Sequence, residues 1–97
     1  MLRSDDLQVF VLTAELGSLS AAARQLELSP AVASAALKRL ETQLGCRLLV
    51  RSTRSLRLTD DGEAYLPHAR SALQSLLEGR QLLAGGKASI SGTLQLS

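Results

Sequence analysis

Six basic side chains lie within residues 38–57, and one acidic residue, Glu41, interrupts them. The six are Lys38, Arg39, Arg47, Arg51, Arg54 and Arg57. The rest of the 97-residue chain carries eight acidic and five basic side chains, so the formal net charge of +2 conceals a local excess of positive charge. Cationic groups concentrated on one segment favour a polyanionic partner bound to one face. The charge pattern alone leaves a solvated charged loop as the alternative.

The acidic residues do not form an evident catalytic site. The densest cluster directly follows Thr59 at the start of an expected helix: Asp60, Asp61 and Glu63. Carboxylates there stabilise the free N–H groups of the first turn, and we assign Asp5 and Asp6 to the same role in an earlier helix. Three serines lack a base to activate them and are assigned as helix caps: Ser18, Ser20 and Ser29. We therefore expect no enzyme.

Single residues that could bind a metal or cofactor are also isolated. Cys46 is the only cysteine, which excludes an intramolecular disulfide and favours a small buried thiol. His68 has no second ligand placed beside it and is assigned to the surface or an interface. Gly85 and Gly86 lack the strand-to-helix context of a phosphate loop and are typical of a linker. We expect no metal and no cofactor.

No segment of the sequence resembles a membrane or secretion signal. The N-terminus lacks the apolar core of a signal peptide. No apolar run approaches the roughly 20 residues that a helix needs to span a bilayer. We therefore expect a cytoplasmic protein that does not contact a membrane.

Apolar spacing predicts two helices in the first 26 residues. Over 5–16, four apolar side chains recur at i, i+3, i+4 and i+7 and form one buried stripe: Leu7, Phe10, Val11 and Ala14. We expect Ser4 to cap this helix and Gly17 to end it. A second, short helix is expected over 19–26, and a turn of about three residues follows it.

The stretch SPAVASAALKRLE predicts a third helix over 30–44, with Ser29 as its cap, Pro30 in its first turn and Gly45 as its end. One face is apolar and should be buried: Ala33, Leu37, Leu40 and Leu44. The opposite face should be exposed and carries Ala31, Ala35, Lys38 and Thr42, with Ser34 at its border. Two helices joined by a tight turn, the second with an outward face, form a helix-turn-helix.

A basic hairpin is predicted directly after these helices. Residues 47–51 and 55–59 are short strand-like runs separated by three residues, with Arg51 and Arg54 at or near the tip. A helix-turn-helix followed by such a hairpin is a winged helix. Its third helix can enter a major groove while the wing follows the backbone or reaches the minor groove. The fold class is therefore mainly α: three helices and a two-stranded wing.

A long fourth helix is predicted over 60–84, with Pro67 kinking it or loosening one turn. Its apolar positions follow coiled-coil spacing, interrupted once by Arg80: Leu66, Ala69, Leu73, Leu76, Arg80 and Leu83, with Leu77 beside them. We expect a second subunit to cover this seam. The predicted organisation is a winged helix over 1–59, a linker and dimerisation helix over 60–84, and a flexible hinge over 85–97 that leads into a further domain.

Five segments together resemble the N-terminal DNA-binding domain of LysR-type transcriptional regulators: DLQVF, GSLSAAARQL, LSPAVASAALKRLE, LGCRLLVRSTRSLRLTDDG and YLPHAR. GTLQLS is similar to the first strand of the effector-binding domain that follows in this family. The resemblance implies a bacterial regulator that binds an interrupted palindrome in duplex DNA as a homodimer. It also implies a small-molecule coinducer for the following domain, and it is compatible with a tetramer and with contact to RNA polymerase.

The resemblance also assigns DNA-binding positions. The DNA-facing start of the recognition helix carries Ser29, Pro30, Ala31, Ser34 and Ala35, and Lys38 follows on the same face. The wing positions, which contact phosphates or the minor groove, include Arg51, Thr53 and Arg54. Pro30 and Ala35 stand where family members often carry Gln and Arg, so this helix offers fewer hydrogen-bonding groups to bases. The alternative function is a winged-helix module for protein association.

Overall fold

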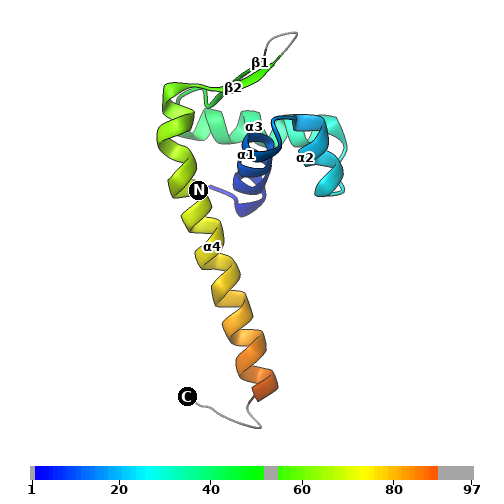
Figure 1. Ribbon diagram of the computed structural model, residues 1–97, viewed down its shortest axis with the longest axis vertical. Coiled ribbons are helices and arrows are strands. Elements are labelled where there is room, and N and C mark those ends of the chain that lie inside the picture. Colours follow the sequence, from blue (N-terminus) through cyan, green and yellow to red (C-terminus); the bar gives the residue numbers. More distant parts are fainter. Residues whose placement is uncertain (1, 52–54, 90–97) are drawn as a thin grey trace.

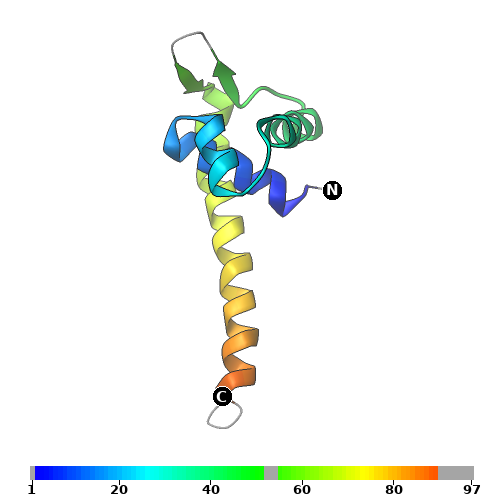
Figure 2. The ribbon, with the colours of Figure 1, turned by 90° about the vertical axis from the view of Figure 1, so that its right-hand side faces the viewer.

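The computed structural model describes residues 2–51 and 55–89, with side chains through Gly85. Its elements, in chain order, are α1 (Ser4–Leu16), α2 (Leu19–Gln25), α3 (Pro30–Leu44), β1 (Leu49–Arg51), β2 (Leu56–Leu58) and α4 (Asp60–Ser89). In Figures 1 and 2, α1, α2 and α3 gather beside the upper end of α4, and the hairpin protrudes beyond them. The predicted winged helix followed by a long helix is confirmed.

Side-chain caps begin α2 and α3, with Ser18 and Ser29 as predicted, whereas the assignment of Ser20 as a cap is wrong because Ser20 lies inside α2. The Ser18 hydroxyl accepts a hydrogen bond from the Ala21 N–H, and the Ser29 hydroxyl accepts one from the Val32 N–H, both at 3.1 Å. Each bond satisfies one of the donors that the first turn of a helix leaves free. The two serines therefore fix where the α1–α2 and α2–α3 connections end.

The ends of α1 and α3 are also local features. Gly17 and Gly45 have φ values of 69° and 75°, in the left-handed region that glycine adopts without steric cost. The predicted cap of α1 is wrong: Arg3 occupies the capping position without a side-chain cap bond, and Ser4 is the first helical residue. The helix therefore begins one residue earlier than the sequence pattern predicts.

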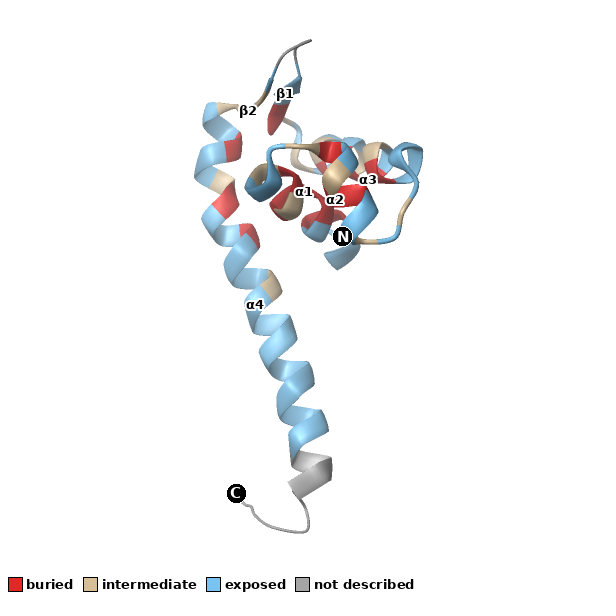
Figure 3. Ribbon diagram, turned by 45° about the vertical axis from the view of Figure 1, so that its right-hand side comes forward, coloured by how far each residue is buried: buried red, intermediate tan, exposed pale blue. Residues whose placement is uncertain are grey.

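The core lies between the three short helices and the upper part of α4 (Figure 3). The predicted stripe of α1 is buried except for the half-buried Ala14, and three more of its residues are buried: Asp6, Val9 and Thr13. On α3, the predicted apolar face is buried, with Leu44 only partly so. Phe10 and Tyr65 lie 6.1 Å apart between ring centroids and join α1 to α4.

The base of the hairpin is tied to the start of α4. The strands pair antiparallel, with Leu49 opposite Leu58 and Arg51 opposite Leu56. The Thr59 hydroxyl accepts a hydrogen bond from the Gly62 N–H at 2.9 Å and donates one to the carbonyl of Arg47 at 2.6 Å. Thr59 thus caps α4, as predicted, and also holds the chain that enters β1.

A close backbone approach explains the glycine in the first turn of α4. A Cβ at Gly62 would overlap the carbonyl oxygen of Leu48 and touch the Leu58 side chain. Leu48 directly precedes β1 and Leu58 ends β2, so this glycine lets α4 pack directly against the base of the wing. A larger residue would force the two elements apart.

The fourth helix is longer than predicted. It runs through Pro67 and through Gly85 and Gly86 to Ser89, so the expected end at Ala84 is five residues too early. Each residue added to an existing helix contributes one hydrogen bond, which offsets a glycine cost of about 1 kcal/mol per residue. At about 1.5 Å per residue, the 30 residues of α4 extend roughly 45 Å. Within the described ranges, no helix is both long and apolar enough to cross a bilayer.

Candidate nucleic-acid interface

The outward face of α3 carries the predicted residues. Ala31, Ala35, Lys38 and Thr42 are exposed, and Ser34 at the border is half-buried. Ser29 and Pro30 are exposed at the start of the same helix. This face combines small side chains near the helix N-terminus with one ammonium group further on. Such a surface allows another molecule to approach the helix backbone closely.

A hollow of about 530 Å³ lies between this face and the base of the hairpin. From α3 it is lined by Ser34, Lys38 and Thr42, and from the hairpin by Arg47, Leu49 and Arg51, among others. The fold thus brings together Lys38 and Arg51, two predicted binding residues separated by 13 positions in the sequence. The result is a concave surface with cationic side chains from both of its sides, the arrangement that attracts a polyanion.

One residue beside the hairpin extends the cationic surface beyond the predicted set. Arg47 is exposed and lines the hollow, and only its place in the basic segment pointed to it in the sequence. Arg57 is also exposed, but it is paired with Val50, so its side chain lies on the opposite face of the hairpin from Leu49 and Arg51. Thr53 and Arg54, the remaining predicted wing residues, lie outside the described residues.

Arg39 belongs to the basic segment in sequence but not in space. Its guanidinium donates two hydrogen bonds to the Asp6 carboxylate, at 2.8 Å from Nε and 2.7 Å from Nη2. The hydrogen bond with Asp6 raises the pKa of Arg39 above its usual value. Asp6 is fully buried, which corrects its assignment to the helix dipole alone. The pair joins α1 to α3 and removes one cation from the interface.

Cys46 is half-buried rather than buried, and it packs against the core beside the hollow. Burial, together with the nearby carboxylates of Asp61 and Glu41, raises the pKa of the Cys46 thiol. A raised pKa keeps the thiol protonated at neutral pH and makes it a poor nucleophile.

The predicted seam on α4 divides into two parts (Figure 3). Leu66 and Ala69 are buried in the core of their own chain, and Leu73 is partly buried against it. These two buried residues are therefore corrected: they hold α4 to its own helices and offer little surface to a partner. Leu76, Leu77, Arg80 and Leu83 are exposed on the part of α4 that projects away.

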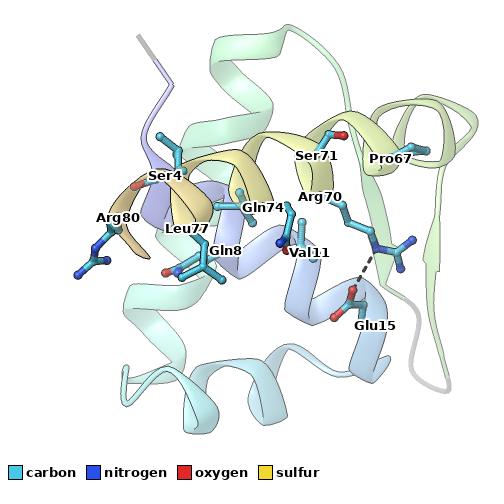
Figure 4. Close-up of a pocket in the computed structure, with 12 residues that line it drawn as sticks. Ser4, Gln8, Val11, Glu15, Pro67, Arg70, Ser71, Gln74, Leu77 and Arg80 are labelled. Carbon is cyan, nitrogen blue, oxygen red and sulfur yellow. Dashed lines mark hydrogen bonds and ion pairs between the residues drawn. The ribbon is translucent and has the colours of Figure 1, made fainter. Parts of the chain in front are cut away.

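A groove of about 810 Å³ continues this exposed surface between α4 and α1 (Figure 4). Gln8 and Val11 line it from α1, and Leu77 and Arg80 line it from α4. Across it, Arg70 donates a hydrogen bond to Glu15 at 3.0 Å. The groove adds α1 residues to a surface that the sequence pattern assigned to the long helix alone.

Comparison with known families decides the classification. Residues 4–63 match the bacterial regulatory helix-turn-helix proteins of the lysR family, which is more than half of the chain. The chain belongs to the LysR family. This match covers the three short helices, the wing and the start of the long helix, so it includes every element of the LysR winged helix seen here.

Related LysR-family proteins agree with this classification. The probable HTH-type transcriptional regulator LtrA of Klebsiella pneumoniae is 41% identical over 89% of this chain and 30% of its own length. The chain therefore spans less than a third of the length of LtrA and of the full-length structures that it resembles. One such structure, a mutant of OxyR from Corynebacterium glutamicum, is 36% identical over 90% of this chain and 27% of its own, with a TM-score of 0.87.

A shorter LysR-family structure allows a comparison over nearly its whole length. The DNA-binding domain of CbnR, solved in a complex with DNA, is 36% identical over 90% of this chain and 98% of its own, with a TM-score of 0.75. The similarity therefore includes both the winged helix and the long helix that follows it.

Proposed function

We propose that this chain is the sequence-specific DNA-binding part of a LysR-type transcriptional regulator in the bacterial cytoplasm. The observation that carries the proposal is the cationic hollow between the outward face of α3 and the wing, with Lys38 and Arg51 on its two sides. In this arrangement α3 enters the major groove and the wing follows the phosphate backbone. The complex of the related CbnR domain with DNA supports the proposal.

Strong salt dependence is the first test. Each phosphate neutralised by Lys or Arg contributes about −0.9 to the slope of log K against log salt concentration. Two subunits with about three contacts each give a slope of roughly −5, or about a thousand-fold loss of affinity between 50 and 200 mM salt. Fluorescence anisotropy with a labelled duplex measures this slope. A value shallower than about −2 would leave the wing and Lys38 without a binding role.

The same titration separates the two candidate functions. A DNA-binding module binds mixed-sequence duplex weakly and its operator tightly, because phosphate contacts act on every sequence. A winged helix used for protein association would bind neither duplex, while it would still self-associate through its exposed leucines. Fragments pulled down from a genome supply the operator for the tight-binding measurement.

The outward face of α3 has few groups that can hydrogen-bond a base, so we propose recognition by close fit. Ser29 and Ser34 have hydroxyls suited to a phosphate at the N-terminal turn of the helix. Ala31 and Ala35 present only methyl groups, whose natural partner in the major groove is the C5-methyl of thymine. We assign Lys38 to a hydrogen bond with O6 or N7 of guanine. Pro30 contributes to the close fit at the helix start.

Replacing thymine by uracil tests this assignment, since uracil lacks only the C5-methyl. We expect one or two positions in each half-site to lose about 0.5–1.5 kcal/mol of binding free energy, the value for burial of one methyl group. Substitution at each half-site position, one at a time, locates them by titration. If no position responds while Lys38→Ala abolishes discrimination, the two alanines are only spacers.

Assembly through the long helix completes the proposal. We propose that the chain forms a homodimer on an interrupted palindrome, through the exposed leucines of α4 and the groove beside α1. The division proposed from sequence stays a winged helix over 1–59, a linker helix from residue 60 and a following effector domain, with the linker helix extended to Ser89. A coinducer bound by that further domain, a tetramer and a contact to RNA polymerase remain proposals for the whole regulator.

A further inference from the structure

Glu41, the one acidic residue in the basic segment, makes specific contacts in the structure. It lies on α3, and its side chain is 14% exposed. Its Oε2 accepts a hydrogen bond from the Leu48 N–H at 2.7 Å and another from the Leu49 N–H at 3.2 Å. These two amides belong to the start of the wing. The carboxylate therefore connects the recognition helix to the wing directly.

The opposite side of the same wing segment is held by the start of α4. Thr59 donates from its hydroxyl to the Arg47 carbonyl at 2.6 Å, and from its N–H to the Leu48 carbonyl at 3.0 Å. Residues 47–49 are thus held between Glu41 on one side and Thr59 on the other. Charge-assisted hydrogen bonds such as those to Glu41 are stronger than bonds between neutral groups, so the α3 side is the firmer one.

The location of Glu41 is unfavourable for a residue without a structural task. Its side chain lines the hollow between Lys38 and Arg51, where the proposed duplex brings phosphate charge. A free carboxylate there would repel phosphates. Here its charge is shared with two backbone N–H groups and lies 3.8 Å from the guanidinium of Arg47. The arrangement uses a negative charge to place the wing while limiting its cost to anion binding.

We propose that Glu41 is a positioning residue that sets the distance and angle of the wing relative to α3. It acts through the Leu48 and Leu49 amides, so that Arg51 on the wing and Lys38 on α3 reach the same duplex together. The inference rests on the proposed DNA-binding function. It adds a determinant of wing geometry that is acidic and acts through the backbone of the wing.

Two variants distinguish the effect of the hydrogen bonds of Glu41 on the wing from the effect of its negative charge. Glu41→Ala removes both the charge and the acceptor oxygens, whereas Glu41→Gln removes the charge but retains an oxygen that can accept from the two amides. Glu63→Ala is the matched control, because Glu63 is an exposed acid in the first turn of α4 and its loss changes the net charge by the same amount. Circular dichroism and thermal melting of each full chain establish that it is folded.

Amide hydrogen exchange in the free protein is the first readout. In Glu41→Ala we expect the Leu48 and Leu49 amides to exchange at least about tenfold faster, with the core amides of α1 and α3 unchanged. Glu41→Gln should retain most of the protection, and Glu63→Ala should retain all of it. Unchanged exchange in Glu41→Ala would overturn the proposal. Because this measurement needs no DNA, it decides whether Glu41 holds the wing independently of duplex binding. Failure of the wild-type chain to bind duplex would instead refute the proposed function.

Duplex affinity in a double-mutant design is the second readout. Glu41→Ala should weaken binding about tenfold, and Glu41→Gln should bind close to the wild type. Arg51→Ala should cost less affinity in the Glu41→Ala background than in the wild type, because the wing is already displaced, whereas the cost of Lys38→Ala should be the same in both. If Glu41→Ala and Glu41→Gln both bind more tightly and the Arg51→Ala cost is unchanged, Glu41 is only a repelling charge and the proposal fails.

Discussion

Replacing Leu76 and Leu77 together with glutamate is expected to produce folded monomers that bind a palindromic duplex at least about a hundred-fold more weakly than the wild type. Both leucines are exposed in the single chain, 54% and 46%, beside the groove between α1 and α4. In a dimer the second half-site is bound intramolecularly, a gain of about 10²–10⁴ in affinity over either half alone. Two buried carboxylates in a subunit interface would remove that gain.

Leu82→Glu is the matched control for this substitution. Leu82 is 74% exposed on the same helix, but at 3.6 residues per turn it lies about 120–140° around the axis from Leu76 and Leu77. We expect this variant to remain dimeric and to bind the palindrome normally. Sedimentation at tens of micromolar measures the assembly, and anisotropy titration measures binding. A wild-type chain that sediments as a monomer would contradict the interface assignment.

The choice of leucines follows from their burial. Leu73 belongs to the seam predicted from sequence, but it packs against the core of its own chain. A charged residue at that position would lower the free energy of unfolding of the monomer as well as weaken assembly. Leu76 and Leu77 are free of this ambiguity because both are exposed in the single chain and neither packs in its core.

The second large effect is expected at Asp6, the buried partner of Arg39. Asp6→Ala removes both acceptors of a two-bond ion pair between α1 and α3, and hydrogen bonds to charged groups contribute about 1.5–3 kcal/mol. We expect the free energy of unfolding to fall by about this amount. Urea denaturation followed by circular dichroism measures it. Because this contact joins α1 to α3, duplex binding should also become more sensitive to temperature.

The neighbouring Asp5 supplies the control. It is exposed in the first turn of the same helix, and Asp5→Ala should change the free energy of unfolding by no more than about 0.5 kcal/mol. A second comparison is the double variant Asp6→Leu/Arg39→Met, since an apolar pair can replace a buried ion pair at little cost. Equal effects of Asp5→Ala and Asp6→Ala would show that the buried pair does not stabilise the domain.

Several features of this chain could be read from the sequence because their causes are local. Ser18 and Ser29 cap the helices that follow them, and Gly17 and Gly45 end the helices before them. The 3.6-residue repeat of apolar side chains placed Lys38 on an outward face, and short apolar runs around a basic turn predicted the wing. Each of these signals involves residues within about one or two turns of one another. The family resemblance then connected them in the correct order.

The roles of charged residues depended on contacts that are distant in sequence. Asp6 and Arg39 are 33 residues apart, and nothing in their own neighbourhoods distinguishes them from the exposed Asp5 and Lys38. In the sequence Glu41 is only an interruption of a basic segment, whereas in the structure it accepts hydrogen bonds from two wing amides. The pairing of charged side chains requires the three-dimensional arrangement of helices, because spacing alone does not specify which groups share a buried surface.

The long helix shows most clearly which features the sequence predicts and which only the tertiary structure reveals. Its start, its length to within five residues and the coiled-coil spacing of its leucines followed from the sequence. The spacing is identical for an apolar stripe that packs on its own domain and for one that packs on a partner. Only the tertiary structure showed that Leu66 and Ala69 are covered by α1 and the rest of the core, while Leu76 and Leu77 are not. Periodicity identifies an apolar face, but what covers that face is decided by where the rest of the chain folds against it.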